Sequence, residues 1–392
     1  MDPQALRAEI RALTLADEAP VLERLTDIAA LDDAARGAVS EAGAGLVRAI
    51  RGANDPGLME VFLAEYGLST EEGIALMCLA EALLRVPDAE TVDALIEDKI
   101  APADWGRHLG RSASSLVNAS TWALMLTGRV LEDEQPGLAG ALRGAVRRLG
   151  EPVIRRAVGR AMREMGNQFV LGEDMGAAMA RAAKLEAEGY THSYDMLGEA
   201  ARTEADARRY LSAYSGAIAA LAPRSGADEV RRNPGVSVKL SALHPRYEQT
   251  QRDRVMAEVV PRIAALARQA ASANMGLNID AEEADRLDLS LDVIAALLHD
   301  PALAGWDGLG VVVQAYGQRA RAVIDWLAAM AAQADRRVMV RLVKGAYWDQ
   351  EIKRAQVMGL AGFPVFTRKP ATDVSYIGCA RRLLQHADRI YP

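Results

Sequence analysis

The sequence predicts an α/β protein whose second half is a distorted (β/α)8 barrel of the TIM type, preceded by helices only. From about residue 151, short apolar runs alternate with helical patterns six times without a reversal, which indicates parallel strands with helical crossovers. No G-x-G-x-x-G follows the first apolar run, and this disfavours an open dinucleotide-binding sheet. The residues before the alternation show helical periodicity alone.

Composition narrows the function classes. The chain has 392 residues, half of them hydrophobic, which is enough for a large core and more than one domain. A formal net charge of −7 argues against a general nucleic-acid binder. Two cysteines fit neither a disulfide framework nor a metal cluster, so we expect a reducing cytoplasm and no bound metal. Because no apolar run reaches 18 residues, any membrane contact would be peripheral.

Three segments are predicted in chain order. Residues 1–51 read as a helical arm, since each helix is short and carries one narrow apolar stripe. Residues 52–138 read as a small α-helical domain with a capping box at Ser69–Glu72. Residues 139–392 form the barrel, and Ile390–Tyr391 look like the start of a seventh strand, so the barrel is expected to be truncated there.

The barrel segment is expected to hold six strands and six helices. The predicted strands are Thr191–Leu197, Val236–Leu243, Gly276–Asp280, Gly310–Tyr316, Val338–Lys344 and Pro364–Lys369. The predicted helices are Glu204–Ala222, Asp253–Ala273, Leu289–His299, Arg319–Ala334, Glu351–Leu360 and Tyr376–His386.

The fifth strand ends in a turn that suits a phosphate. Val338–Lys344 is an apolar run interrupted by Arg341, and Gly345 then breaks it before a helix. A strand, a glycine turn and a helix start present backbone N–H groups and a positive dipole end to an anion. Lys344 and Trp348 would add charge and a ring for stacking.

Strand parity brings polar side chains to one mouth of the barrel. In each of five strands, one polar residue faces opposite to its apolar neighbours near the carboxyl end. Isolated charges inside a barrel are costly unless they are paired or used, so this set predicts a site. Neither a nucleophile–base arrangement nor a metal cluster is legible, which favours a cofactor that performs the chemistry. The five residues are Lys239, Asp280, Gln314, Arg341 and Thr367.

Several long motifs closely resemble the proline dehydrogenase domain of the proline utilization A family. The motifs are Ser193–Ala200, Gly235–Tyr247, Asn278–Arg286, Val313–Tyr316, Arg341–Asp349 and Thr367–Lys369. The resemblance implies a flavoenzyme that oxidises L-proline to Δ1-pyrroline-5-carboxylate by hydride transfer from proline C5 to the N5 atom of FAD. It also implies reoxidation of the flavin by a membrane quinone, and a second, NAD-dependent domain that oxidises the channelled product to glutamate.

The resemblance also implies residue roles. Lys239 should face the proline carboxylate, Asp280 should organise substrate and flavin, Glu199 should pair with a substrate-binding arginine, and Arg341 should lie beside the flavin N5. Gln314 should bind the pyrimidine edge of the flavin. The remaining FAD shell is expected from Ala281, Val343, Lys344, Gly345, Ala346, Tyr347, Trp348, Thr367, Arg368 and Lys369.

Departures from the family pattern carry further expectations. The last two strands and the final helix, with its arginine pair and tyrosine, are expected to be missing, as is the NAD-dependent domain. No basic ribbon–helix–helix segment precedes the arm, so we expect no nucleic-acid partner. The family implies a homo-oligomer of the full-length protein in the cytoplasm, peripheral on the inner membrane.

Two alternatives stay open at this point. One is a phosphate-binding barrel aldolase or lyase that uses Lys239 as a Schiff base, which would be colourless and trapped by borohydride. The other is a non-catalytic fragment whose helical arm serves dimerisation, and it would bind no FAD.

Overall fold

The computed structural model describes residues 2–52, 91 and 170–392. By its contacts the chain divides into two units, Met1–Asp33 with Ala182–Pro392 and Ala34–Arg181, and each is described by itself. The capping box at Ser69–Glu72 and nearly all of the predicted small helical domain lie outside the described residues, so that domain stays a prediction.

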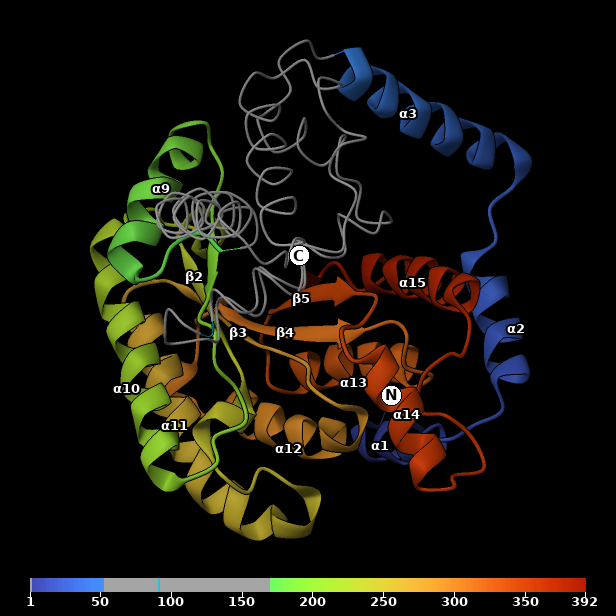
Figure 1. The fold of residues 1–392 in the computed structure, drawn as a ribbon. Coiled ribbons are helices and arrows are strands. Elements are labelled where there is room, and N and C mark those ends of the chain that lie inside the picture. The colour runs from blue at the N-terminus through green and yellow to red at the C-terminus, as the bar shows by residue number, and fades with distance from the viewer. Residues whose placement is uncertain (1, 53–90, 92–169) are drawn as a thin grey trace, which may run out of the picture. The chain divides into compact units, whose positions relative to one another are not determined.

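Six parallel strands form the sheet of the first unit, and they pair in chain order (Figure 1). Among the described residues no pairing joins the first strand to the last, so this barrel-type sheet is unclosed. The predicted α/β barrel architecture is therefore confirmed as far as these strands reach. The strands are β1 (Ser193–Asp195), β2 (Gly235–Val238), β3 (Gly276–Ile279), β4 (Leu309–Gln314), β5 (Val338–Val343) and β6 (Ile390–Tyr391).

Helices connect the strands and surround them on the outside (Figure 1). The first crossover helix begins at a capping box, in which the side chains of Thr203 and Asp206 each bond the other's backbone N–H. These helices are α10 (Glu204–Leu221), α11 (Arg252–Ser272), α12 (Leu287–Leu298), α13 (Ala320–Gln333), α14 (Trp348–Val357) and α15 (Lys369–Leu384), and α9 (Met175–Ala187) precedes β1.

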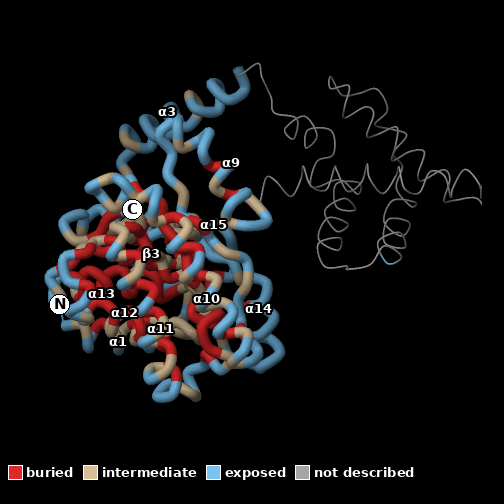
Figure 2. Tube along the Cα trace, turned by 90° about the vertical axis from the view of Figure 1, so that its left-hand side faces the viewer, coloured by how far each residue is buried: buried red, intermediate tan, exposed pale blue. Residues whose placement is uncertain are grey.

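The core lies between the strands and these helices. The middle of the unit is buried, as Figure 2 shows, and the apolar parity of β2 to β5 is part of this core. Ile279, Val311 and Val313 face the α12 and α13 side chains Leu291 and Val323 across a small cavity. The opposite parity therefore points to the inside of the barrel, which is where strand alternation placed the polar residues.

The first two arm helices pack on the barrel helices. In α1 (Pro3–Ala12) the buried side chains are Leu6 and Ile10, and this helix lies against α13. In α2 (Glu18–Ala29), Val21 and Leu25 pack with Phe366 at the start of α15. The third arm helix, α3 (Asp33–Gly52), has no buried residue.

Ion pairs reinforce the seat of α1. Arg7 contacts Asp288 at 3.2 Å and Asp292 at 2.9 Å, and Arg11 contacts Asp288 at 3.0 Å. Arg319, on the barrel side, reaches Asp288 at 3.5 Å. These five residues are called the arm ion cluster below.

One predicted strand is wrong. Pro364–Lys369 forms no strand, and only Val365 makes an isolated antiparallel bridge, to Gly317. The apolar run that suggested a strand is buried for another reason, because Phe366 packs under α2 of the arm. The segment then turns into α15, and the sixth strand of the sheet is Ile390–Tyr391, which pairs with Val338 and Met339 of β5. The residues expected to open a seventh strand therefore form the sixth.

The second predicted strand is shorter than expected. After Val238 the chain leaves the sheet at Lys239, and Leu240–Leu243 form a turn of 3₁₀-helix. Lys239 keeps an extended backbone, so its strand parity still holds. No described helix is both long enough and apolar enough to span a bilayer.

Candidate active site

A row of alternating charges crosses the carboxyl ends of four strands. Lys239 Nζ lies 3.4 Å from Asp195 Oδ1 and 2.9 Å from Asp280 Oδ2. The other oxygen of Asp280 contacts Arg341 Nη2 at 2.5 Å. We call Asp195, Lys239, Asp280 and Arg341 the strand-end charge row. Its two positive and two negative groups neutralise one another, which offsets the desolvation cost of their partly buried positions.

The register of the sheet explains why three of these four meet, and Asp195 is paired with Ser237, two positions before Lys239. Ser237, Asn278, Gly310 and Met339 are paired across β2 to β5. Lys239, Asp280 and Arg341 each follow one of these residues by two positions, so they form the next inward-facing layer. The predicted convergence of Lys239, Asp280 and Arg341 is thus seen in the structure, while their roles stay a proposal.

A neutral polar layer supports the charge row from below. The hydroxyls of Ser193 and Ser237 lie 3.2 Å apart, and Arg341 Nη2 donates to Ser237 Oγ at 3.1 Å. Asn278 occupies the space above Gly310, where a Cβ would sit 1.9 Å from its Oδ1. Gly310 therefore makes room for the amide, and the layer fixes the Arg341 guanidinium from beneath.

The charge row keeps Lys239 protonated. Burial alone would lower the pKa of its ammonium, but hydrogen bonding and charge from Asp280, together with Asp195, outweigh burial and raise it. The backbone N–H of Lys239 also donates to the Tyr214 hydroxyl at 3.3 Å, and burial raises the pKa of that phenol to about 12. A lysine whose ammonium form is favoured by two carboxylates suits the binding of an anion.

The turn after β5 is held by β4 and its loop. Gly345 has a φ of +143°, and a Cβ there would lie 2.4 Å from the Tyr316 ring. Glycine is required on both counts. Gln314 Oε1 accepts the Ala346 N–H at 3.2 Å, and Gln314 Nε2 donates to the Glu282 carbonyl at 2.9 Å. The Gln314 amide, expected to bind a flavin edge, here joins the turn to the loop after β3, beside the half-buried Ala281.

Two further predicted residues begin α14. Tyr347 is its N-cap, and the Trp348 indole donates to the Phe366 carbonyl at 2.8 Å while 40% of the residue stays exposed. Burial, together with the charge of Glu199, raises the pKa of Tyr347. Glu199 itself is exposed and forms no ion pair within the described part of the chain, so its expected pairing with an arginine stays a prediction.

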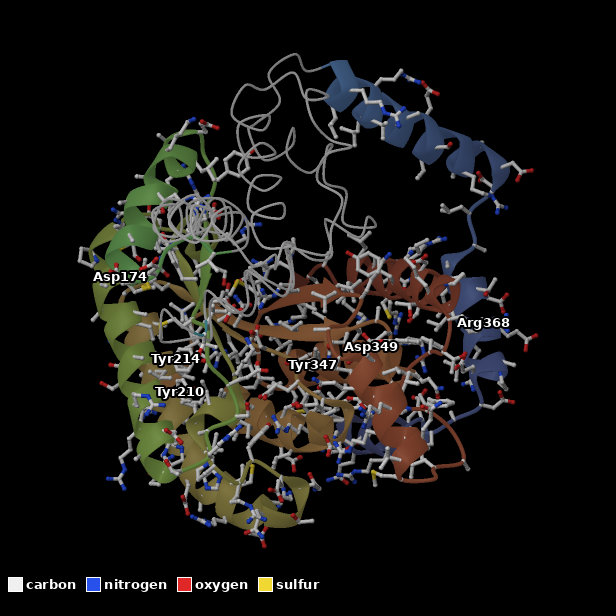
Figure 3. All side chains as sticks on the ribbon, in the orientation of Figure 1. Asp174, Tyr210, Tyr214, Tyr347, Asp349 and Arg368 are labelled. Carbon is white, nitrogen blue, oxygen red and sulfur yellow. The ribbon has the colours of Figure 1, made fainter. Side chains whose placement is uncertain are left out.

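Lysines gather separately at the start of α15. Lys344 Nζ lies 2.6 Å from Asp373 Oδ1, and Lys369 Nζ lies 2.8 Å from Asp373 Oδ2. Thr367, Arg368 and Lys369 are exposed, and Figure 3 shows Arg368 beside α2, while Tyr347 lies nearer the middle of the barrel. Thr367 therefore does not join the strand-end charge row, contrary to the parity argument, because its segment is not a strand.

Sequence reasoning missed three contributors. Asp195 follows Ser193 by two residues on β1, so the parity argument applied to that strand would have found it. Ser237 lies on the inward parity of β2, but a serine in an apolar run carries no distinctive signal. Asp373 is reached only through the fold, since it follows Lys344 by 29 positions.

A small cavity borders the site on the helix-facing side of the sheet. It has a volume of about 60 Å³ and lies between β3 and β4 on one side and α12 and α13 on the other, with Leu291, Ile294 and Val323 in its wall. Asp280, Ala281 and Gln314 line the end of the cavity that is nearest the strand ends. The strand-end charge row lies at the open mouth of the sheet, where a large ligand has access.

Comparisons with known proteins agree with the geometry. Residues 178–392 match a family model described as Proline dehydrogenase. Residues 4–51 match the Proline utilization A proline dehydrogenase N-terminal domain, and residues 58–169 match the DNA-binding domain of Proline dehydrogenase. The last name differs from the expectation of no nucleic-acid partner, and that region lies outside the described residues.

Bacterial relatives and solved structures are also similar. Bifunctional protein PutA of Salmonella typhimurium is 53% identical over 337 residues, which cover 86% of this chain and 26% of the relative. The Rhizobium meliloti protein of that name is 51% identical over 96% of this chain and 30% of its own length. This chain thus spans between a quarter and a third of these relatives.

Among solved structures, proline utilization A of Bradyrhizobium japonicum has a TM-score of 0.70 at 49% identity, over 97% of this chain and 38% of that one. The structure from Bdellovibrio bacteriovorus, described as inactivated by N-propargylglycine, has a TM-score of 0.65 at 21% identity, over 96% of this chain and 34% of that one, and shows the fold alone.

Proposed function

Because the chain belongs to the proline dehydrogenase family of proline utilization A, we propose that it carries the L-proline-oxidising part of a larger flavoenzyme. The observation that carries the proposal is the strand-end charge row, which places a cationic Lys239 beside Asp280 and Arg341 at the mouth of the barrel. This arrangement suits a zwitterionic amino acid whose carboxylate needs a fixed cation.

The residues present fit FAD in their chemistry. Gly345, with its positive φ, allows the turn that separates β5 from α14, and Lys344, Arg368 and Lys369 supply cations for a pyrophosphate. The exposed part of the Trp348 ring offers a stacking face for an adenine. When bound, FAD would accept the hydride from C5 of proline, and with loss of a proton from the ring nitrogen the substrate would become Δ1-pyrroline-5-carboxylate.

The chain's own residues bind and orient. Lys239 holds the substrate carboxylate, and Asp280 fixes the positions of both Lys239 and Arg341 through its two oxygens. Arg341, with 43% of its side chain exposed, would hold positive charge beside the flavin N5. Electrostatic groups that are preorganised in this way cost no reorganisation during the transfer.

Family membership supports the wider setting of the proposal. A membrane quinone would reoxidise the flavin, and an NAD-dependent domain would convert the channelled product to glutamate. The intact protein would act as a homo-oligomer in the cytoplasm, peripheral on the inner membrane. The whole relatives are much longer than this chain, so these statements concern the intact protein.

An absorbance spectrum of the purified intact protein, before and after L-proline, tests the proposal. We expect flavin bands that bleach on adding proline. Flavin bands that do not respond would contradict proline as the substrate, and a colourless protein would contradict the cofactor. Borohydride with a carbonyl substrate tests the aldolase alternative, for which a stable adduct on Lys239 would be required.

A further inference from the structure

The segment that leads into α15 is held by contacts to three different elements. Phe366 N–H donates to the Tyr316 carbonyl at 2.8 Å, in the loop after β4. The Phe366 carbonyl accepts from the Trp348 indole at 2.8 Å, at the start of α14. The next N–H, of Thr367, donates to Glu18 Oε1 at 2.8 Å, at the start of the arm helix α2. Three consecutive backbone groups are thus held by β4, α14 and the arm.

The arm contact is supported by close packing. Val21 and Leu25 of α2 bury Phe366 and Ala371. Gly378 of α15 lets α2 come near, since a Cβ there would lie 3.2 Å from the Leu25 carbonyl oxygen. Arg381 of α15 also donates to the Ala30 carbonyl at the end of α2. The helix–helix interface therefore fixes the backbone of α2, from which the Glu18 carboxylate reaches the Thr367 N–H.

The Glu18 carboxylate lies beside a cationic segment. Arg368 and Lys369 follow Thr367 directly, and Lys344 shares Asp373 with Lys369, so the segment presents cations. A negative group beside an anion-binding segment weakens the binding of the anion, so its presence calls for a separate structural role. The hydrogen bond to the Thr367 N–H is that other role, because it sets the direction of the backbone just before the cationic residues.

We infer that Glu18 of the arm is a positioning residue for the cofactor segment Thr367–Lys369, acting through its hydrogen bond to the Thr367 N–H. The inference rests on the proposed FAD site. The arm thereby contributes to cofactor affinity without touching the cofactor. Removing the carboxylate frees the Thr367 backbone, and the cations after it lose their common orientation.

The test measures the FAD dissociation constant of the intact protein, by fluorescence quenching after the flavin has been removed and titrated back. Loss of a hydrogen bond to a charged group predicts that Glu18→Ala weakens FAD binding about five- to tenfold. Glu18→Gln keeps an oxygen acceptor and removes the opposing charge, so its affinity should stay within about twofold of the wild type. Glu23→Ala, an exposed glutamate on the same helix, is the matched control and should change nothing.

A second variant acts on the same contact from the opposite side. Gly378→Ala pushes α2 away from α15 without touching Glu18. It should weaken FAD binding about two- to fivefold, and the double variant with Glu18→Ala should be less than additive, since both disturb one contact. Thermal unfolding of the flavin-free variants shows that they are folded.

The outcomes separate the two claims. A wild-type protein that binds no FAD overturns the proposed function. A wild-type protein that binds FAD, together with a Glu18→Ala variant of equal affinity, overturns the positioning role alone. Additive effects of Glu18→Ala and Gly378→Ala, or equal losses in Glu18→Ala and Glu18→Gln, also overturn it.

Discussion

The strand-end charge row and the arm ion cluster share one design and differ in one property. In each, an aspartate lies between two or more cations: Asp280 between Lys239 and Arg341, and Asp288 among the arginines that seat α1. Arg319 in the arm ion cluster is only 5% exposed, whereas Arg341 is 43% exposed. The arm ion cluster is covered by helix α1, whereas the strand-end charge row faces the open mouth of the barrel.

This difference separates a structural joint from a binding site. In the arm ion cluster, burial lowers the pKa of Arg7 and of Arg319, although neighbouring aspartates oppose it. The side chains of Arg7 and Arg319 are only 11% and 5% exposed and already contact aspartates, so they offer little free positive charge to a ligand. In the strand-end charge row, the exposed side of Arg341 leaves room for a ligand group. The charge pattern alone does not distinguish the two, and the degree of enclosure does.

The largest effect is expected from Asp280→Ala in the intact protein. Lys239 and Arg341 would lose their shared anchor, and proline-dependent flavin reduction should fall about a hundredfold or more. Stopped-flow absorbance measures the rate, and Asp280→Asn, which keeps the shape and one acceptor oxygen, should lose less. An Asp280→Ala enzyme with normal kcat/KM would place the chemistry elsewhere.

Asp288→Ala should lower the stability of the fold and leave the rate of flavin reduction unchanged. It leaves the buried Arg7 and Arg319 without their common partner, so the free energy of unfolding should fall by about 2–4 kcal/mol. The rate of flavin reduction in the folded fraction should not change. Urea denaturation measures the loss. Asp285→Ala, which breaks the half-exposed pair with Arg354, is the matched control and should cost below about 1 kcal/mol. Equal losses in the two variants would mean that enclosure is not what matters.

The smallest effect concerns the proton on Lys239. Its pKa is raised in the folded state, so the ion pair stabilises the fold below the ordinary lysine pKa and is lost only as the pH rises above it. At pH 9, an amine-reactive label should therefore modify Lys239 at least about tenfold more slowly than the exposed Lys353. Mass spectrometry of peptides reads both rates in one sample. Labelling that is equally fast, or that does not accelerate in Asp280→Asn, would contradict the pairing.

Strand parity predicted much of the site because it is a local property. Lys239, Asp280 and Arg341 could be placed together from the alternation of three strands, without knowing any distant contact. Thr367 could not be placed, because the apolar Val365–Phe366 looks the same whether it is buried in a sheet or under a helix. Only the arm decides between these two, and its contact lies 349 positions away in sequence.

The hydrogen-bond partners of the Gln314 side-chain amide could also not be predicted from the sequence. Gln314 ends β4, and its side chain bonds two backbone groups from different loops. The alternation of strands and helices, by contrast, predicted five of the six strands within a few residues, since burial on both sides of a parallel strand leaves a continuous apolar run.

The contact between α2 and α15 also affects the order in which these parts can fold during synthesis. Glu18 leaves the ribosome 349 residues before its partner Thr367, which at about 5–20 residues per second is a delay of roughly 20–70 s. During that interval the apolar stripe of Val21 and Leu25 has no α15 to cover it. Helix α2 is therefore one of the last parts of the barrel unit to dock, although it is among the first to be synthesised, and its arrival completes the segment that leads into α15.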